Sequence, residues 1–336
     1  MSEPIGVAIV GASARSRMMH YYFDGFPHEG FVTGMYDPIP QRCRYILDSF
    51  DAKDAAVYAS VEEAVNDPRA QAVFVASRDD AHVDGALAAL QAGKHVYCEK
   101  PMAITVEDCD RIIEAAQDAA GVFYVGMNLR HSPVQERMHE ILASGQLGAL
   151  LTIEANEYYS GGKTYFRRWN RLRACGGGLW ITKACHDFDL LNWLAGGRAR
   201  RVFAASSLSF YRPRADAADR CRDCPLAETC PDVYDVRAMA GTVKDDLRKI
   251  TEEATGFPRD LCLWNADKDT FDNGIAVVDY DTDVRATYTV NVVSARDTRQ
   301  LRLMGTEGAA EGDMKAGTVT VWRRSDFTTT THDLRP

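Results

Sequence analysis

The sequence predicts an α/β protein of two domains: a doubly wound parallel sheet, then an α+β domain with a large open, mostly antiparallel sheet. The chain has 336 residues, whereas single domains mostly run to about 100–200 residues. Short apolar runs alternate with helical patterns up to about residue 126, and period-2 runs follow later. This change of pattern predicts domains at 1–127 and 128–336, with a cysteine-rich insertion near 212–262.

Composition restricts the class of protein. Hydrophobic residues make up 46% of the chain and charged residues 26%, as in ordinary globular proteins. The net charge of −9 argues against a nucleic-acid surface, which needs a basic patch. Apolar runs stay far below the roughly 18 residues of a membrane span, and the N-terminus lacks an export-signal pattern. We therefore expect a cytoplasmic protein with reduced thiols and no membrane or nucleic-acid partner.

The first domain is predicted from its strands and helix caps. Solid apolar runs separated by helices indicate a parallel sheet that is covered on both faces. Ser60 and Glu63 form a capping-box pattern, Thr105 can cap the helix that follows it, and Gly121 can end that helix. The strands are expected in the runs GVAIVG, FVTGMYD, AVFVAS, HVYCEK and VFYVGM.

The second domain begins with a different pattern. A helix is expected over 133–143 and a strand near 150–156, followed by a polar loop and a helix within 176–194. Period-2 alternation then predicts an antiparallel meander with a tight turn near 281–283. The alternating runs are NGIAVVDYDTDVRATYTVNVV, RQLRLMGT and TVTVWRR.

The first strand runs into GASARSR, at the place where a dinucleotide-binding fold carries G-x-G-x-x-G. Gly11 keeps this pattern, but Ser13 and Ser16 stand at the other two glycine positions. These small residues still allow backbone N–H groups to approach a pyrophosphate at the start of a helix near Arg15. The loop is therefore a candidate dinucleotide site.

Asp37 ends the second strand, where a carboxylate accepts hydrogen bonds from a ribose and repels a 2′-phosphate, which favours NAD over NADP. Asp37 could instead be only a turn residue before Pro38, and Arg15 and Arg42 leave NADP open. The expected cofactor contacts are Gly11, Ala12, Ser13, Ala14, Arg15, Asp37, Ser77, Glu99 and Lys100.

Two further motifs carry candidate catalytic residues. Lys100 follows the strand in HVYCEKPMA, and ligands of doubly wound sheets bind off the carboxyl ends of strands. Lys183 and His186 lie in GGGLWITKACHDFDLLNWL, which otherwise has the pattern of a buried helix and places both on one helical face. Taken singly, these residues would be a surface charge, an exposed helix charge and a core histidine.

The motifs GASARS, CEKP and the glycine-preceded helix, in this order over essentially the whole chain, resemble the Gfo/Idh/MocA family. The resemblance implies a Rossmann domain, then a domain whose open sheet forms the interface of a homo-oligomer, a dimer or tetramer. It also implies hydride transfer between a nicotinamide cofactor and a secondary hydroxyl or ketone of a sugar or cyclitol. Lys100 matches the lysine of the family's E-K-P motif, and His186 matches its histidine near the reacting hydroxyl.

One position departs from the family pattern. Many members have Asp four residues before the histidine, where this chain has Thr182. We expect Lys183 to share or replace the role of that aspartate. A base whose pKa lies near the operating pH removes a hydroxyl proton best, and two lysines beside NAD⁺ would lower each other's pKa. Which of Lys100, Lys183 and His186 takes the proton stays open.

The loop before the glycines combines aromatic and hydrogen-bonding side chains, which suits a polyol, although oligomer interfaces have a similar composition. The acidic net charge would suit a cationic substrate, so aminosugars and aminoglycosides are included. The expected substrate contacts are Asn128, Arg130, Tyr159, Arg168, Trp169, Asn170 and Asp187.

The insertion contains a C-x-x-C motif followed by further cysteines, which indicates a metal site when four thiolates converge. A closed zinc site would stabilise the insertion, and reduced thiols, a disulfide or an iron–sulfur cluster are the alternatives. The last cysteine of the set is chosen from its occurrence in related sequences. The predicted zinc ligands are Cys221, Cys224, Cys230 and Cys262.

The sequence therefore predicts an NAD-dependent dehydrogenase of a sugar, aminosugar or cyclitol. Two alternatives remain: an NAD-dependent glycosidase that oxidises its substrate transiently, and a non-catalytic, sugar-responsive regulator with the same fold. The joint presence of Lys100, Lys183 and His186 speaks against the regulator.

Overall fold

The computed structural model describes residues 3–335 and divides into two compact units. Unit 1 comprises the chain up to Gly126 together with Trp169–Gly177 and Arg214–Asp267. Unit 2 comprises Met127–Arg168, Gly178–Pro213 and the chain from Lys268 onward. Two segments beyond residue 127 thus belong to unit 1, although the sequence pattern assigns them to the second domain. Within residues 3–335, no helix has the length and apolar character that a membrane crossing requires.

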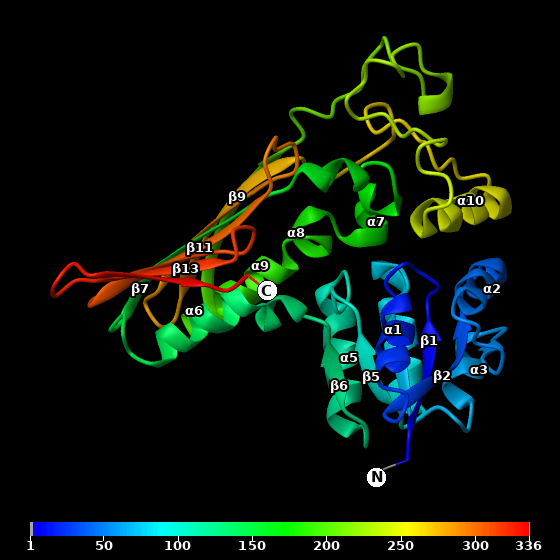
Figure 1. The fold of residues 1–336 in the computed structure, drawn as a ribbon, viewed down its shortest axis with the longest axis horizontal. Helices are drawn as coiled ribbons and strands as arrows, with labels where there is room; N and C mark the ends of the chain where they lie inside the picture. The colour runs from blue at the N-terminus through cyan, green and yellow to red at the C-terminus, as the bar shows by residue number, and fades with distance from the viewer. Residues whose placement is uncertain (1–2, 336) are drawn as a thin grey trace. The chain divides into compact units, whose positions relative to one another are not determined.

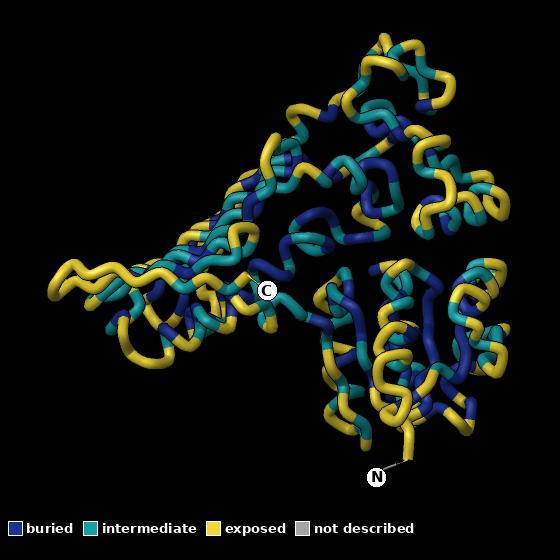
Figure 2. Tube along the Cα trace, in the orientation of Figure 1, coloured by how far each residue is buried: buried dark blue, intermediate teal, exposed yellow. Residues whose placement is uncertain are grey.

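Unit 1 is built on a parallel sheet with the strand order β3-β2-β1-β4-β5-β6 (Figure 1), which confirms the predicted doubly wound fold. Its central strands are buried and its helices expose their outer faces (Figure 2). The strands are β1 (Ile5–Val10), β2 (Gly30–Tyr36), β3 (Ala56–Val57), β4 (Ala72–Val75), β5 (His95–Cys98) and β6 (Phe123–Val125). The helices are α1 (Arg17–Gly25), α2 (Pro40–Ser49), α3 (Val61–Asn66), α4 (His82–Gln91), α5 (Val106–Asp118), α7 (Arg173–Gly176) and α10 (Val243–Thr255).

Local signals in unit 1 agree with the structure at the helix starts. Ser60 Oγ accepts a hydrogen bond from Glu63 N at 3.1 Å, and Thr105 Oγ1 accepts one from Asp108 N at 3.1 Å. These caps satisfy backbone N–H groups that have no partner inside the helix. The predicted end of α5 is less accurate, because α5 stops at Asp118. Strand β3 was not predicted, since two residues are too short to show a period.

Unit 2 is built on an eight-stranded sheet with the order β14-β13-β12-β11-β7-β10-β9-β8. Its neighbours pair antiparallel except β7 and β10, which run parallel. The strands are β7 (Leu150–Tyr158), β8 (Ala199–Ser207), β9 (Asn273–Tyr280), β10 (Arg285–Asn291), β11 (Thr298–Gly305), β12 (Gly308–Asp313), β13 (Thr318–Arg323) and β14 (Thr329–Asp333). The helices are α6 (Pro133–Ala143), α8 (Leu179–Thr182) and α9 (Cys185–Ala195).

The two faces of this sheet differ. Helix α6 packs on β12 and β13, and α9 packs on β7. Strand β9 shows the alternation clearly, because Ala276 and Val278 are buried whereas Ile275 and Val277 are exposed. Phe203 on β8 is 64% exposed. The second face of the sheet therefore leaves large apolar side chains in contact with solvent.

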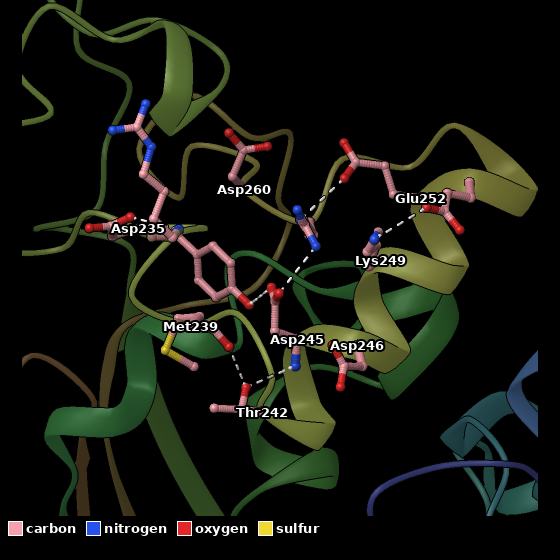
Figure 3. A network of polar contacts seen from close by, with 12 residues as sticks. Asp235, Met239, Thr242, Asp245, Asp246, Lys249, Glu252 and Asp260 are labelled. Carbon is pink, nitrogen blue, oxygen red and sulfur yellow. Dashed lines mark hydrogen bonds and ion pairs between the residues drawn. The ribbon is translucent and has the colours of Figure 1, made fainter. Parts of the chain in front are cut away.

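The insertion in unit 1 is held by charged side chains. Helix α10 lies against α2, where Tyr45 Oη donates to Asp246 Oδ2 at 2.7 Å. Asp245 accepts a hydrogen bond from Tyr234 Oη at 2.7 Å and pairs with Arg259 at 3.1 Å (Figure 3). We call the following residues the insertion cluster: Arg220, Arg222, Asp245, Glu252, Arg259 and Asp260.

Candidate active site

The predicted dinucleotide loop follows β1 and depends on one glycine. Gly11 has a φ of +106°, and a Cβ atom there would lie 2.3 Å from Ser77 N at the end of β4. Glycine therefore allows the ends of β1 and β4 to approach each other. Ser13 Oγ accepts hydrogen bonds from Arg15 N and Ser16 N at 3.2 and 3.3 Å, and Ser16 Oγ donates to Ser13 O at 2.7 Å. The two serines thus shape a tight turn before α1.

Asp37 connects this loop to the end of β2. Its carboxylate accepts hydrogen bonds from Ala12 N and Ile39 N, each at 2.9 Å. Arg42 donates to Ala12 O through Nε and Nη2 at 3.0 and 2.7 Å, and to Thr251 Oγ1 of α10 at 3.3 Å. Asp37 is therefore more than a turn residue, and the Arg42 guanidinium is bound to protein groups at this edge of the sheet.

Glu99 and Lys100 follow β5 at the same edge. Arg15 Nε lies 2.7 Å from Glu99 Oε1, which joins the loop after β1 to the end of β5. Burial raises the pKa of Glu99, and the charges of Arg15 and Lys100 oppose this shift. His82 lies 2.7 Å from Pro101 O through Nδ1 and 3.3 Å from Ser77 O through Nε2. The predicted cofactor residues thus gather at the carboxyl ends of β1, β2, β4 and β5.

In unit 2, Lys183 and His186 do not share a helix, so that part of the prediction is wrong. Helix α8 ends at Thr182, α9 begins at Cys185, and Lys183 lies between them. Gly177 and Gly178 precede α8 with φ values of +68° and +85°, a conformation that side chains disfavour. The break turns Lys183 away from the path of a continuous helix, and His186 lies nearly buried in the first turn of α9.

Lys183 belongs to a buried group of charges. Its Nζ atom lies 2.7 Å from Glu157 Oε1 and 4.2 Å from the centroid of the Tyr159 ring. Arg299 Nη2 lies 3.1 Å from Glu157 Oε2, and Arg299 also donates to both oxygens of Asp187 at 2.9 and 2.8 Å. Tyr288 Oη donates to Asp187 Oδ2 at 2.8 Å. We call the following residues the inner cluster: Glu157, Lys183, Asp187, Tyr288 and Arg299.

Burial changes the acidity of the inner cluster. It lowers the pKa of Lys183, an effect that the charge of Glu157 opposes. It raises the pKa of Glu157, which Arg299 opposes and the like charge of Asp187 reinforces. The two shifts move toward each other because desolvation disfavours both charged forms. Lys183 is therefore easier to deprotonate than a surface lysine.

Several predicted substrate residues have protein partners. Arg130 binds both oxygens of Asp189 at 2.7 and 2.6 Å and lies over the Trp193 ring. Asp187 is engaged by Arg299 and Tyr288, an arrangement that fixes α9 to the sheet.

The remaining predicted substrate residues fall into both units. Asn128 lies in a short 3₁₀ helix of unit 2, and Tyr159 follows β7. Arg168 Nε donates to Thr164 O at 3.2 Å. Trp169 and Asn170 lie in a 3₁₀ turn that belongs to unit 1.

Sequence reasoning missed Glu157, Arg299 and Tyr288. Glu157 has the strand parity of buried Ile153, and Arg299 has the parity of buried Leu301. A charged residue at an inward position of an alternating strand was therefore a usable signal. The pairing itself was not readable, because Glu157 and Arg299 face each other only through the β7–β11 register.

The predicted zinc site is not supported. Within residues 3–335, no group of three or more His, Cys, Asp or Glu side chains has an arrangement that could hold a metal ion. In the structure, Cys221, Cys224, Cys230 and Cys262 do not form disulfides. In their place, Asp260 accepts hydrogen bonds from Arg222 N, Nε and Nη2 at 2.9, 2.8 and 2.8 Å. Charged groups thus join the segment around Arg222 to the segment around Asp260.

Comparison with known proteins is consistent with this architecture. A family model described as an oxidoreductase family with an NAD-binding Rossmann fold matches residues 5–127, and the GFO/IDH/MocA C-terminal domain matches residues 135–311. YteT of Bacillus subtilis is 29% identical over 299 residues, which are 84% of this chain and 70% of YteT.

One further relative and one solved structure match different shares of this chain. Inositol 2-dehydrogenase of Salmonella typhimurium is 28% identical over 164 residues, 48% of this chain, and the match spans less than half of that enzyme, 46%. The structure of levoglucosan dehydrogenase in complex with NADH superposes with a TM-score of 0.74 at 17% identity, covering 98% of this chain and 80% of that one. This likeness shows the fold.

Proposed function

Because this chain belongs to the Gfo/Idh/MocA oxidoreductase family, we propose that it is an NAD-dependent dehydrogenase of a secondary hydroxyl on a sugar, aminosugar or cyclitol. The observation that carries the proposal is the inner cluster, which holds a lysine of lowered pKa beside a buried carboxylate. The fold alone would not carry it, since one fold serves many functions.

The residues at the carboxyl edge of the unit 1 sheet fit a dinucleotide. Gly11 lets the loop after β1 pass close to the backbone of Ser77, which a Cβ would meet at 2.3 Å, and Asp37 presents a nearly buried carboxylate at the end of β2. We assign the adenosine ribose to Asp37 and the pyrophosphate to the loop from Gly11 to Arg15. NAD is favoured over NADP because Asp37 would repel a 2′-phosphate and because Arg42 is engaged by Ala12 O.

The chemistry requires that a hydroxyl lose a proton while its carbon loses a hydride, which bound NAD⁺ accepts. We propose Lys100, Lys183 and His186 as the catalytic residues. Lys183 is the candidate proton acceptor that the structure supports best, because burial keeps its amine closer to neutrality. An ammonium formed there would be stabilised by Glu157 at 2.7 Å.

The substrate class rests on the relatives, whose names refer to inositol and levoglucosan. The chain spans less than half of the inositol dehydrogenase. We therefore keep a wide substrate class that includes aminoglycosides, and propose residues 128–336 as the substrate domain and residues 1–127 as the dinucleotide domain. A cytoplasmic location stays part of this proposal.

The test is the formation of reduced nicotinamide by the purified protein with NAD⁺ or NADP⁺ and a panel of sugars, inositols and aminoglycosides. A signal with NAD⁺ that is lost in Lys183→Met and His186→Ala supports the proposal. The matched control is Lys249→Met, a lysine on α10 with an exposed side chain, which should keep full activity. Tight NAD binding without oxidation of any polyol would favour the glycosidase or the regulator instead.

We also propose that the exposed apolar face of the eight-stranded sheet is the contact between copies in a dimer or tetramer. Phe203, Ile275 and Val277 lie on neighbouring strands and leave apolar area in solvent. Light scattering should give a multiple of the 37.3 kDa chain mass, and Phe203→Glu with Ile275→Glu should reduce it. A wild-type protein that is monomeric at micromolar concentration would exclude this interface.

A further inference from the structure

Glu157 lies at the centre of the inner cluster and divides its two carboxylate oxygens between two cations. Oε1 lies 2.7 Å from Lys183 Nζ, and Oε2 lies 3.1 Å from Arg299 Nη2. Arg299, however, makes its two hydrogen bonds to Asp187, at 2.9 and 2.8 Å. Arg299 therefore serves both Asp187 and Glu157, whereas Lys183 is the closest cation to Glu157 and pairs with Glu157 alone among the two carboxylates.

With Glu157 and Asp187 both ionised, the charges of the cluster add to zero only when Lys183 carries its proton. Arg299 and Lys183 then balance Glu157 and Asp187. Loss of the Lys183 proton leaves one net negative charge in a nearly buried position, since the side chains of Glu157 and Asp187 are 7% and 4% exposed. A buried net charge is unfavourable, so the cluster attracts a proton to Lys183 whenever one is released nearby.

Tyr159, Asp297 and Tyr288 also influence Lys183, but less directly than Glu157 does. Tyr159 presents its ring face to the ammonium at 4.2 Å, a favourable contact for a cation. Asp297, in the loop before β11, accepts a hydrogen bond from Ser160 N at 2.6 Å. This contact and, to a smaller extent, the charge of Lys183 lower the pKa of Asp297. Tyr288 of β10 acts on the cluster through Asp187. Glu157 is thus the one of these groups that contacts the Lys183 amine directly through a charge.

We propose that Glu157 is the positioning residue of Lys183: it holds the amine over the Tyr159 ring and supplies the counter-charge that decides when Lys183 carries a proton. The inference rests on the proposed function. In the oxidation, the hydroxyl proton passes to the lone pair of Lys183 Nζ as the carbonyl forms, and a bound nicotinamide would supply the acceptor for the C–H hydride. The new ammonium is held by Glu157 in the same place.

The test measures Lys183 directly, by NMR titration of protein labelled with ¹³Cε-lysine, with the signal assigned through Lys183→Met. In Glu157→Gln, Arg299 becomes the nearest charge, and like charge favours the neutral amine. The titration midpoint of Lys183 should therefore fall by about one pH unit or more, which is about tenfold in proton affinity. Glu157→Asp keeps the charge and should restore most of the midpoint. Glu154→Gln, on the exposed face of β7, is the matched control and should leave it unchanged.

The kinetic counterpart is the pH profile of kcat/KM for oxidation. Its rising limb should move to lower pH in Glu157→Gln and stay in place in Glu154→Gln, a result that a purely structural role would not produce. A folded Glu157→Gln protein whose Lys183 midpoint is unchanged overturns the inference. If no polyol is oxidised, the proposed function fails, while the NMR titration still decides the role of Glu157.

A second measurement covers the case in which Glu157→Gln does not fold. In Lys183→Met, Glu157 loses its closest cation, so its pKa, which burial already raises, should rise further. Infrared spectra should then show a protonated carboxyl band in Lys183→Met at a pH where the band is absent from wild type and from Lys183→Met/Glu157→Gln, which has no carboxyl at this position. Absence of the band at every pH between about 5 and 8 would overturn the coupling.

Discussion

The inner cluster and the insertion cluster both combine buried carboxylates with cationic side chains, but the pKa of Glu157 in the inner cluster is raised, whereas the pKa of Asp260 in the insertion cluster is lowered. In the inner cluster, burial is the largest influence, so the pKa of Lys183 is lowered and that of Glu157 is raised. In the insertion cluster, burial also acts to raise the pKa of Asp260, but hydrogen bonds from Arg222 prevail and lower it to about 2.

The difference lies in how many donors each carboxylate receives. Asp260 accepts three hydrogen bonds from Arg222 alone, whereas Glu157 has one close lysine and a second cation at 3.1 Å. A carboxylate with several charged donors keeps its charge and acts as a structural link. A carboxylate with one lysine shares a proton with it, which suits a site of proton transfer.

The largest effect should come from removing the arginine of the inner cluster. Arg299→Met leaves Asp187 and Glu157 as buried charges, and loss of one partner of a buried pair costs about 3–5 kcal/mol. The free energy of unfolding in urea measures this loss. Arg302→Met, on the same strand with a side chain 39% exposed, should cost about 1 kcal/mol or less. Equal losses of stability in the two variants would show that the ion pairs of the inner cluster contribute no more than a partly exposed ion pair.

The insertion cluster should show its strength at low pH. The pKa of Asp260 is depressed when folded, so its stabilisation is present above the unfolded value near 3.8 and is lost as pH falls toward 2. The contribution is about 2 kcal/mol, and Asp260→Asn should remove this part of the pH dependence of unfolding. Asp333→Asn is the control, because Asp333 also has a pKa of about 2 but is exposed. A wild-type stability that stays constant from pH 5 to 2 would contradict the assignment.

A smaller effect is expected when both members of the Lys183–Glu157 pair are replaced. Lys183→Met/Glu157→Gln removes both charges, and replacing a buried ion pair by groups of similar volume is often nearly neutral, within about 1 kcal/mol. Each single variant should be less stable than the double variant, since it leaves one charge without its partner. A double-mutant cycle in urea checks this order. Additive losses would mean that the two side chains are not coupled.

The smallest effect is expected from metal removal. A chelator should leave the thermal midpoint unchanged, since ion pairs such as Arg222–Asp260 hold the insertion and no group of three or more metal-ligating side chains is found within residues 3–335. Cys224→Ser should cost less than about 0.5 kcal/mol, as for ordinary surface positions. A midpoint that falls with chelator and recovers with added zinc would restore the zinc hypothesis.

Local signals in the sequence predicted a large part of the fold. The capping residues Ser60 and Thr105 start their helices as expected, and the helix over 133–143 has the predicted bounds. Such features depend on neighbours within a few residues, which the sequence displays directly. The edge strands β8 and β14 and the inner strand β12 were not predicted, because their runs are short or strongly charged.

The sequence by itself therefore determined the alternation of strands and helices, the caps and the position of Gly11, because short-range sterics and hydrogen bonds decide these. The tertiary structure alone decided that β7 pairs parallel with β10 and antiparallel with β11. That sheet order sets Arg299 opposite Glu157, and the break after α8 brings Lys183 to the same carboxylate. The physical reason is that pairing register and loss of water depend on segments far apart in the chain, and both are needed to shift the pKa of Lys183.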